Sequence, residues 1–331
     1  MKKVLALVLG AMLLLVPAFS LAADFSAAMV TDTGGVNDRS FNQNVWEGLQ
    51  LAEKSLGIAV NYMQSTQEAD YAPNLETLLD NGTNLIFGVG FLLGDSTQAA
   101  AEANPDTQYV CVDYGYENPP ANLVGLSFQE EQPGFLAGYV AGKMTQTNKV
   151  GFLGGMAVPA VVAYEWGYYA GAKYANPDVE VVQQYAESFN DVPKGKAIAT
   201  QMFNEDVDIV FCCGGTMGVG GIEAAKEMGK WAIGVDVDQS YLAPESILTS
   251  AMKFLDIAVE DLCKQAVEGT FEGGNFVGNL ANGMVGLPAT TSNLVPEEVL
   301  AELEAVKAAI LDGSLSIPRD EAQAVEMGFK K

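Results

Sequence analysis

Several side chains that suit the recognition of a flat polar molecule follow predicted strands in this sequence. Phe41 and Phe189 lie in the first and second halves of the chain, and two aromatic walls of this kind can sandwich a planar ring. Asp113 and Asp236 each end a predicted strand, and their carboxylates can accept hydrogen bonds from hydroxyl or ring N–H groups. Lys253, just beyond another strand, supplies a lone donor. These residue types predict a site that binds by stacking and hydrogen bonding.

The segment from Asp32 to Asn42, DTGGVNDRSFN, is the richest of the loops that follow strands. Its glycines permit a sharp turn, and Asp38 or Ser40 can cap the helix that comes next. Helix capping accounts for Asp38 and Ser40 but not for Phe41 and Asn42, so we expect the latter pair to contact a ligand. Three further candidates end other predicted strands at the same crevice: Gly90, Phe91 and Gly214.

Short apolar, β-branched runs alternate with longer amphipathic segments along the chain, which is typical of βαβ units. A first set of strands is predicted at Ser26–Thr31, Ala59–Met63, Leu85–Val89, Tyr109–Asp113 and Leu123–Phe128. After a glycine-spaced helix, a second set is predicted at Val150–Leu153, Glu180–Tyr185, Ile209–Cys213 and Ala232–Val235. The pattern predicts an α/β protein with two doubly wound parallel-sheet lobes, each with its ligand crevice at the carboxyl ends of its strands.

The remaining elements are too few for a third domain. They are a strand at Ile247–Met252, a helix at 255–268, a short strand near Met284–Leu287 and a helix at 297–311. We expect them to complete the two lobes, which then comprise residues 23–128 with 250–283 and residues 129–249 with 284–331. Several crossings between the lobes would form a hinge.

Composition and residue spacing argue against an enzyme. The sequence has no histidine, which excludes Ser-His and Cys-His nucleophile pairs and most catalytic zinc sites. Asp113 and Asp236 are conceivable as a glycosidase pair, although two acids across a cleft equally describe hydroxyl recognition. The loop after the first strand faintly resembles the calcium motif of nucleoside hydrolases, but it offers only Asp32 and Asp38 to a cation. We expect no catalytic residues, cofactor or metal.

The first residues have the features of a signal peptide. Two lysines follow Met1, an apolar run from Val4 to Val16 is short for spanning a bilayer, and Ser20 and Ala22 are small. We expect cleavage after about Ala22, a periplasmic or secreted protein, and no membrane insertion after cleavage. A net charge of −25 argues against nucleic acid and anionic lipid as partners.

The four cysteines are expected to be buried thiols, although export permits disulfides. Cys111 and the adjacent Cys212 and Cys213 lie in apolar runs, where cysteine usually behaves as a small hydrophobic residue. Cys263 is the fourth.

Three motifs stand in a characteristic order, with Thr249, Ser250 and Lys253 after them: DRSFN at 38–42, GFLGGM at 151–156 and GVDVDQ at 234–239. Together they resemble the basic membrane protein family, also called the purine nucleoside receptor-like family, over essentially the whole mature chain. The resemblance implies a type I periplasmic-binding fold, an extracytoplasmic solute receptor of an ABC importer, and a cognate ABC permease as partner.

The resemblance also implies that the ligand is a nucleoside. Its base would lie between Phe41 and Phe189, while Asn42 and Asp113 would read the base. The wall of the site would be shaped by Asp38 and by the glycines Gly88, Gly90, Gly214 and Gly215.

The ribose hydroxyls would bind Asp236 and Lys253 on the same resemblance. Asp238 stays open as an alternative to Asp236, because alternation along a strand puts both side chains on one face. A receptor for a sugar or an autoinducer on the same fold also stays open.

Two departures from the family pattern affect the expectations. Many relatives carry a lipid-attachment cysteine directly after the signal peptide, whereas Leu21–Asp24 contains none, so we expect a mature protein without a lipid anchor. Relatives more often have phenylalanine near the position of Trp166, and an indole there would resize the pocket. Trp166 is therefore a candidate ligand contact, with packing inside its own lobe as the alternative.

Overall fold

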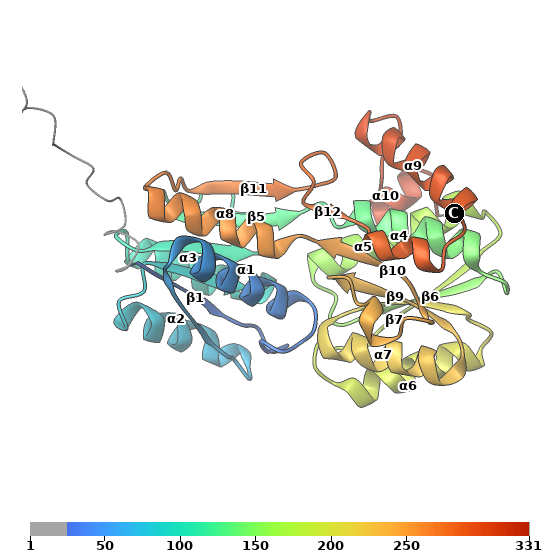
Figure 1. Cartoon of the computed structure of the whole chain (residues 1–331), viewed down its shortest axis with the longest axis horizontal. Coiled ribbons are helices and arrows are strands. Elements are labelled where there is room, and N and C mark those ends of the chain that lie inside the picture. Colours follow the sequence, from blue (N-terminus) through green and yellow to red (C-terminus); the bar gives the residue numbers. More distant parts are fainter. Residues whose placement is uncertain (1–24, 331) are drawn as a thin grey trace, which may run out of the picture.

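The computed structural model describes residues 25–330, which fold into two lobes that lie side by side (Figure 1). The proposed signal peptide and its cleavage site lie outside the described residues. In the described part of the chain, no helix is both long enough and apolar enough to cross a membrane. Each lobe has a six-stranded sheet between two layers of helices, so the predicted α/β class and two-lobe architecture are confirmed.

The first lobe is built on a fully parallel sheet with the strand order β11-β5-β4-β3-β1-β2. Its strands are β1 (Ser26–Val30), β2 (Ala59–Met63), β3 (Leu85–Val89), β4 (Gln108–Val112), β5 (Leu123–Phe128) and β11 (Gly274–Gly278). One face of this sheet is covered by α1 (Phe41–Leu56) and α8 (Leu255–Glu268). The other face is covered by α2 (Tyr71–Asp80) and α3 (Gly94–Ala103).

The second lobe repeats this arrangement with the strand order β12-β10-β9-β8-β6-β7. Its strands are β6 (Lys149–Gly154), β7 (Glu180–Tyr185), β8 (Ile209–Cys213), β9 (Trp231–Asp236), β10 (Ile247–Lys253) and the short antiparallel β12 (Val285–Gly286). The helices α4 (Glu131–Met144), α5 (Pro159–Ala175) and α9 (Glu297–Leu311) lie on one face. On the other face lie α6 (Val192–Asn204) and α7 (Gly215–Met228), and α10 (Glu321–Glu326) packs against α5.

The chain crosses between the lobes three times, after β5, after β10 and between β11 and β12. Backbone hydrogen bonds join the crossings: Gln129 N donates to the Gly278 carbonyl at 2.8 Å, and Phe254 N donates to the Met284 carbonyl at 3.0 Å. The expected lobe boundary at residue 250 is wrong, because β10 continues to Lys253 inside the second sheet. The sequence alone does not show at which residue the chain leaves one sheet and crosses to the other lobe.

The buried apolar side chains show which parts of the two lobes are joined. One continuous cluster includes residues of α1 and α8 in the first lobe and of α4, α5 and α9 in the second. The side chains under α2 and α3 form a separate cluster, as do those under α6 and α7. The lobes are therefore fused through the layer that contains the crossings, and a hinge motion changes mainly the contacts on the opposite side of the sheets.

Glycines allow α4 and α5 to pack with their backbones in contact. On α4, Gly134 and Gly138 are one turn apart and face α5, where Gly171 faces α4. A Cβ atom on Gly138 would clash with the carbonyl oxygen of Tyr168, and one on Gly171 would clash with that of Phe135. The glycine spacing seen in the sequence therefore has a packing function.

All four cysteines are buried free thiols, as expected from their apolar surroundings. Burial raises the pKa of Cys111, Cys212 and Cys263 to about 12, and it raises the pKa of Cys213 well above its ordinary value. These thiols are therefore uncharged at physiological pH.

We expect Gly138→Ala to lower the free energy of unfolding by about 1–3 kcal/mol, the usual cost of overpacking a close contact. The measurement is urea denaturation followed by circular dichroism. Gly115→Ala is the matched control, because Gly115 has an ordinary backbone φ and a Cβ there would have only one neighbour within 4 Å, at 3.8 Å. Equal stability of the two variants would contradict the role assigned to the α4–α5 contact.

Candidate functional site

A cavity lies between the two lobes, where the carboxyl ends of the parallel strands of both sheets face each other. The residues predicted for the ligand site line this cavity, except Trp166 and the wall glycine Gly88. The first lobe contributes Asp32, Gly34, Asp38, Phe41, Asn42, Gly90, Phe91, Leu92 and Asp113. The second lobe contributes Val158, Ala160, Val161, Tyr164, Phe189, Cys213, Gly214, Gly215, Val235, Asp236 and Lys253.

Trp166 does not line the cavity, so its assignment as a ligand contact is wrong. Its ring lies 5.2 Å from the ring of Tyr169, and the ammonium of Lys330 lies 4.9 Å above it. The residues of α5 that line the cavity are Ala160, Val161 and Tyr164, and the Tyr164 hydroxyl donates to the Ala251 carbonyl at 3.3 Å. Residues two apart on a helix point in directions about 200° apart, so a choice between Tyr164 and Trp166 requires the orientation of α5.

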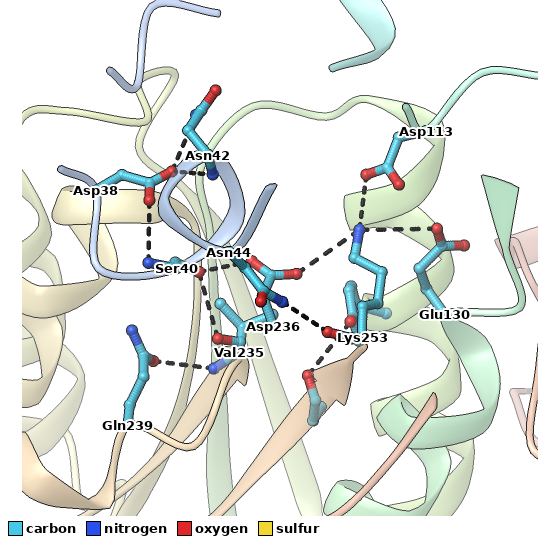
Figure 2. Close-up of polar contacts among 12 residues, drawn as sticks. Asp38, Ser40, Asn42, Asn44, Asp113, Glu130, Val235, Asp236, Gln239 and Lys253 are labelled. Carbon is cyan, nitrogen blue, oxygen red and sulfur yellow. Dashed lines mark hydrogen bonds and ion pairs between the residues drawn. The ribbon is translucent and has the colours of Figure 1, made fainter. Parts of the chain in front are cut away.

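A buried lysine is the centre of the polar network in the cavity (Figure 2). Lys253 Nζ lies 2.7 Å from Asp113 Oδ2, 3.6 Å from Asp236 Oδ1 and 4.0 Å from Glu130 Oε1. It also lies 4.7 Å from the centre of the Phe41 ring. Asp113 follows β4 in the first lobe and Lys253 ends β10 in the second, so this ion pair joins the lobes.

The charged groups in this network shift one another's pKa values. Burial opposes the charge on Lys253, but Asp113, Asp236 and Glu130 outweigh this effect and raise the pKa of the lysine. Burial raises the pKa of Asp236 to about 6, although Lys253 and the Ser40 hydroxyl favour its ionised form. Burial also raises the pKa of Glu130 above its ordinary value, with the charge of Asp113 adding to the effect and those of Lys253 and Arg319 opposing it.

Glu130 is a member of the network that the sequence did not reveal. It immediately precedes α4 at the first crossing, and its Oε2 accepts from Arg319 Nη2 at 3.3 Å. Arg319 Nη1 also lies 3.2 Å from Glu131 Oε2. The segment after α9 is thereby connected through Glu130 to Lys253.

Asp38 organises the loop that leads into α1. Its Oδ1 accepts from the backbone N–H groups of Ser40 and Gln43, and its Oδ2 accepts from both the backbone and the side-chain amide of Asn42. The Asn42 amide also donates to Asp32 Oδ1 at 2.8 Å. Asp38 and Asn42 both line the cavity, but much of the hydrogen-bonding capacity of Asp38 is used to hold the loop in shape.

Two buried acceptors in the cavity have no hydrogen-bond partner among the described residues. They are Asn42 Oδ1 and Asp113 Oδ1. A buried acceptor without a partner costs about 1–3 kcal/mol, so a ligand with donor groups at these positions would be bound favourably. Together with the phenylalanines from both lobes, these atoms fit a flat molecule that carries N–H or O–H groups.

The structure distinguishes Asp236 from Asp238. Strand β9 ends at Asp236, whose φ of 64° turns the chain, so the expected alternation does not continue to Asp238. Asp236 lines the cavity, whereas Asp238 accepts hydrogen bonds from Ser240 N and Thr290 Oγ1 in its own lobe. Of these two carboxylates, only that of Asp236 lines the cavity.

The carboxylates of Asp32 and Asp38 are occupied by hydrogen bonds within their own loop. Both accept hydrogen bonds from Asn42, and no group of three or more metal-ligating side chains occurs within residues 25–330. Burial raises the pKa of Asp32 to about 6, which further weakens it as a ligand for a hard cation.

Comparisons with known proteins agree with this geometry. The family described as "ABC transporter substrate-binding protein PnrA-like" matches residues 25–321. The "ABC transporter nucleoside-binding protein BmpA" of Lactococcus lactis subsp. cremoris is 39% identical over 317 residues, with 89% of each chain covered. "Basic membrane protein A" of Borreliella afzelii is 37% identical over 291 residues, with 86% of this chain and 89% of the relative covered.

Solved structures show the same fold. The solved structure of an ABC transporter system solute-binding protein from Aeropyrum pernix K1 matches with a TM-score of 0.83 and 26% identity, over 92% of this chain and 96% of the other. An arabinose-binding protein from Geobacillus stearothermophilus shares the fold at a TM-score of 0.60 and 16% identity, over 82% of this chain and 98% of the other. Since the family match spans most of the sequence, the chain belongs to the PnrA-like family of ABC transporter substrate-binding proteins.

Proposed function

We propose that this extracytoplasmic receptor binds a purine nucleoside in the cavity between its lobes and delivers it to a cognate ABC permease. The observation that carries the proposal is that Phe41 and Phe189, from opposite lobes, line one cavity together with buried acceptors that lack partners. Aromatic walls stack on a base, and the acceptors suit its N–H groups. The relative from Lactococcus lactis, described as nucleoside-binding, supports the same ligand class.

Each polar group has a role in this proposal. Asn42 Oδ1 and Asp113 Oδ1 accept hydrogen bonds from the base, because both are buried acceptors without partners. Asp236 accepts from a ribose hydroxyl, and Lys253 donates to a ribose oxygen while its charge stays balanced by the carboxylates around it. Gly90 and Gly214 shape the wall of the cavity because they carry no side chain.

The test is calorimetric titration of protein from which any bound molecule has been removed by unfolding and refolding. Guanosine, inosine and adenosine are compared with the free purine bases, ribose and arabinose. We expect nucleosides to bind in a 1:1 ratio. Bases and sugars should bind more weakly, because a free base lacks the contacts to the ribose and a free sugar lacks the contacts to the base. Binding of a sugar without any binding of nucleosides would contradict the proposal and favour a sugar receptor.

We expect Phe189→Ala to weaken nucleoside binding about five- to a hundredfold and to leave the fold intact. Stacking of a base on an aromatic ring contributes about 1–3 kcal/mol, which corresponds to this range. The dissociation constants are measured by calorimetry. Phe276→Ala is the control, because Phe276 lies on β11 with a partly exposed ring and does not line the cavity. An affinity of Phe189→Ala equal to that of the control would remove Phe189 from the site.

Nucleoside affinity should fall as the pH is lowered below about 6. In the free protein the carboxyl of Asp236 has a pKa raised to about 6 by burial, so below this pH it binds a proton and loses acceptor capacity for a hydroxyl. One such group makes the dissociation constant rise up to about tenfold for each pH unit. Calorimetry between pH 5 and pH 8 measures this dependence.

Asp236→Asn is the matched variant for the pH series. It should bind nucleosides more weakly at pH 8, because an amide presents a donor where the ligand also donates, and its pH dependence should be shallower. An affinity of the unmodified protein that stays constant from pH 5 to pH 8 would contradict an ionised Asp236 as acceptor.

A further inference from the structure

One loop of the first lobe reaches across the cleft into the second lobe at three places. It comprises residues 31–40, between β1 and α1. The Thr33 carbonyl accepts from Asn190 Nδ2 at 2.8 Å, and the Arg39 carbonyl accepts from Gln239 Nε2 at 3.0 Å. Ser40 Oγ donates to Asp236 Oδ2 at 2.6 Å. Asp236 lines the cavity, but Asn190 and Gln239 do not.

The side chain of Gln239 is held in place by its own lobe. It is almost fully buried, and its Oε1 accepts from the backbone N–H of Val235 at 3.0 Å (Figure 2). Its backbone N–H donates to Ser250 Oγ at 3.1 Å. A Cβ atom on Gly234 would lie 2.7 Å from Gln239 Oε1, so the glycine makes room for this side chain. The Nε2 group is therefore the one part of the Gln239 amide that serves the opposite lobe.

The acceptor for Gln239 is equally well fixed. Arg39 has a φ of 57°, a left-handed conformation that is unfavourable for a residue with a side chain. Asp38 holds this conformation by accepting from the N–H groups that follow, including that of Ser40 at 3.0 Å. The Arg39 carbonyl is thereby presented in a set direction, so donor and acceptor meet without reorganisation when the lobes approach.

Asn190 provides the corresponding contact at the other end of the loop. It directly follows Phe189, and its Oδ1 accepts from Ser188 Oγ at 3.1 Å within its own loop. Its Nδ2 donates across the cleft to Thr33. As with Gln239, one end of the amide is fixed in the second lobe and the other reaches the first.

We propose that Gln239 and Asn190 are positioning residues that latch the two lobes together over the bound ligand without touching it. Each donates one hydrogen bond that exists only while the lobes are closed, and each is oriented beforehand by its own lobe. The pair therefore sets how long the ligand stays in the cavity. Gln239, the last residue of the GVDVDQ motif, thus takes part in closing the lobes although it lies outside the cavity.

The proposal makes a kinetic distinction, because a contact that forms only on closure changes the dissociation rate and leaves the encounter rate alone. Gln239→Glu keeps an oxygen for the Val235 N–H but removes the donor to Arg39. Asn190→Ala removes the other donor at an exposed position and adds no charge. Asp238→Asn is the control, since Asp238 makes its side-chain hydrogen bonds within its own lobe.

The experiment measures guanosine association and dissociation by stopped-flow fluorescence, and the thermal unfolding of the ligand-free proteins. We expect Asn190→Ala to release guanosine about three- to tenfold faster, the effect of losing one neutral hydrogen bond. Gln239→Glu should accelerate release at least as much, because its new carboxylate oxygen also faces the Arg39 carbonyl oxygen. The association rate should not change in either variant. The melting temperature of the ligand-free Asn190→Ala variant should not change. Unchanged dissociation in both latch variants, or the same acceleration in Asp238→Asn, overturns the proposal.

The guanosine measurement rests on the proposed function, and a second measurement separates the two. Dyes are attached to cysteines introduced at Glu76 on α2 and Asn204 on α6, which are exposed, while the native cysteines are buried. Single-molecule energy transfer then reports the closed fraction without ligand. A lower closed fraction in the double variant Gln239→Glu with Asn190→Ala supports the latch even if no nucleoside binds, and an equal fraction overturns it.

Discussion

The buried ammonium of Lys253 is the interaction on which the arrangement of the site depends. An isolated charge at this depth would cost many kcal/mol, so the lysine requires carboxylates around it. Those carboxylates come from both sides of the cleft, with Asp113 from the first lobe 2.7 Å away and Asp236 from the second 3.6 Å away. The ends of β4, β9 and β10 must therefore converge, and their convergence creates the cavity between the lobes.

The same charge network extends into the hinge. Glu130 stands at the first crossing and lies between Lys253 at the second crossing and Arg319 near the C-terminus. The continuous apolar core and the backbone contact of α4 with α5 stiffen this side of the molecule. On the opposite side the lobes are joined by the loop of residues 31–40 through a few hydrogen bonds. The lobes are packed firmly against each other on the side of the crossings and are joined by only a few hydrogen bonds on the opposite side. This arrangement lets the two lobes separate and close without unfolding.

Most of the fold was predictable because its strands are short apolar runs followed by amphipathic helices, and the bounds of β2, β3 and β5 match the expectation residue for residue. Strand β11 was missed, because Gly274–Gly278 has a glycine at each end, three exposed residues between them, and a partner strand far away in sequence. The site loops were predictable from the rule that parallel strands present their carboxyl ends to ligands. The role of Glu130 was not predictable, because only the folded chain brings its carboxylate close to Lys253.

In the absence of ligand, the hydrogen bonds of the proposed latch favour closed lobes, whereas the unpartnered acceptors in the cavity oppose closure. Closing the lobes forms hydrogen bonds from Gln239 and Asn190, each worth about 0.5–1.5 kcal/mol. Closing also leaves Asn42 Oδ1 and Asp113 Oδ1 buried without partners, at a cost of about 1–3 kcal/mol each. The unpartnered acceptors therefore oppose closure of the empty protein, whereas the hydrogen bonds across the cleft favour it. A ligand that donates to both acceptors removes this cost, while the hydrogen bonds from Gln239 and Asn190 remain. Closure is therefore favoured when the cavity is filled.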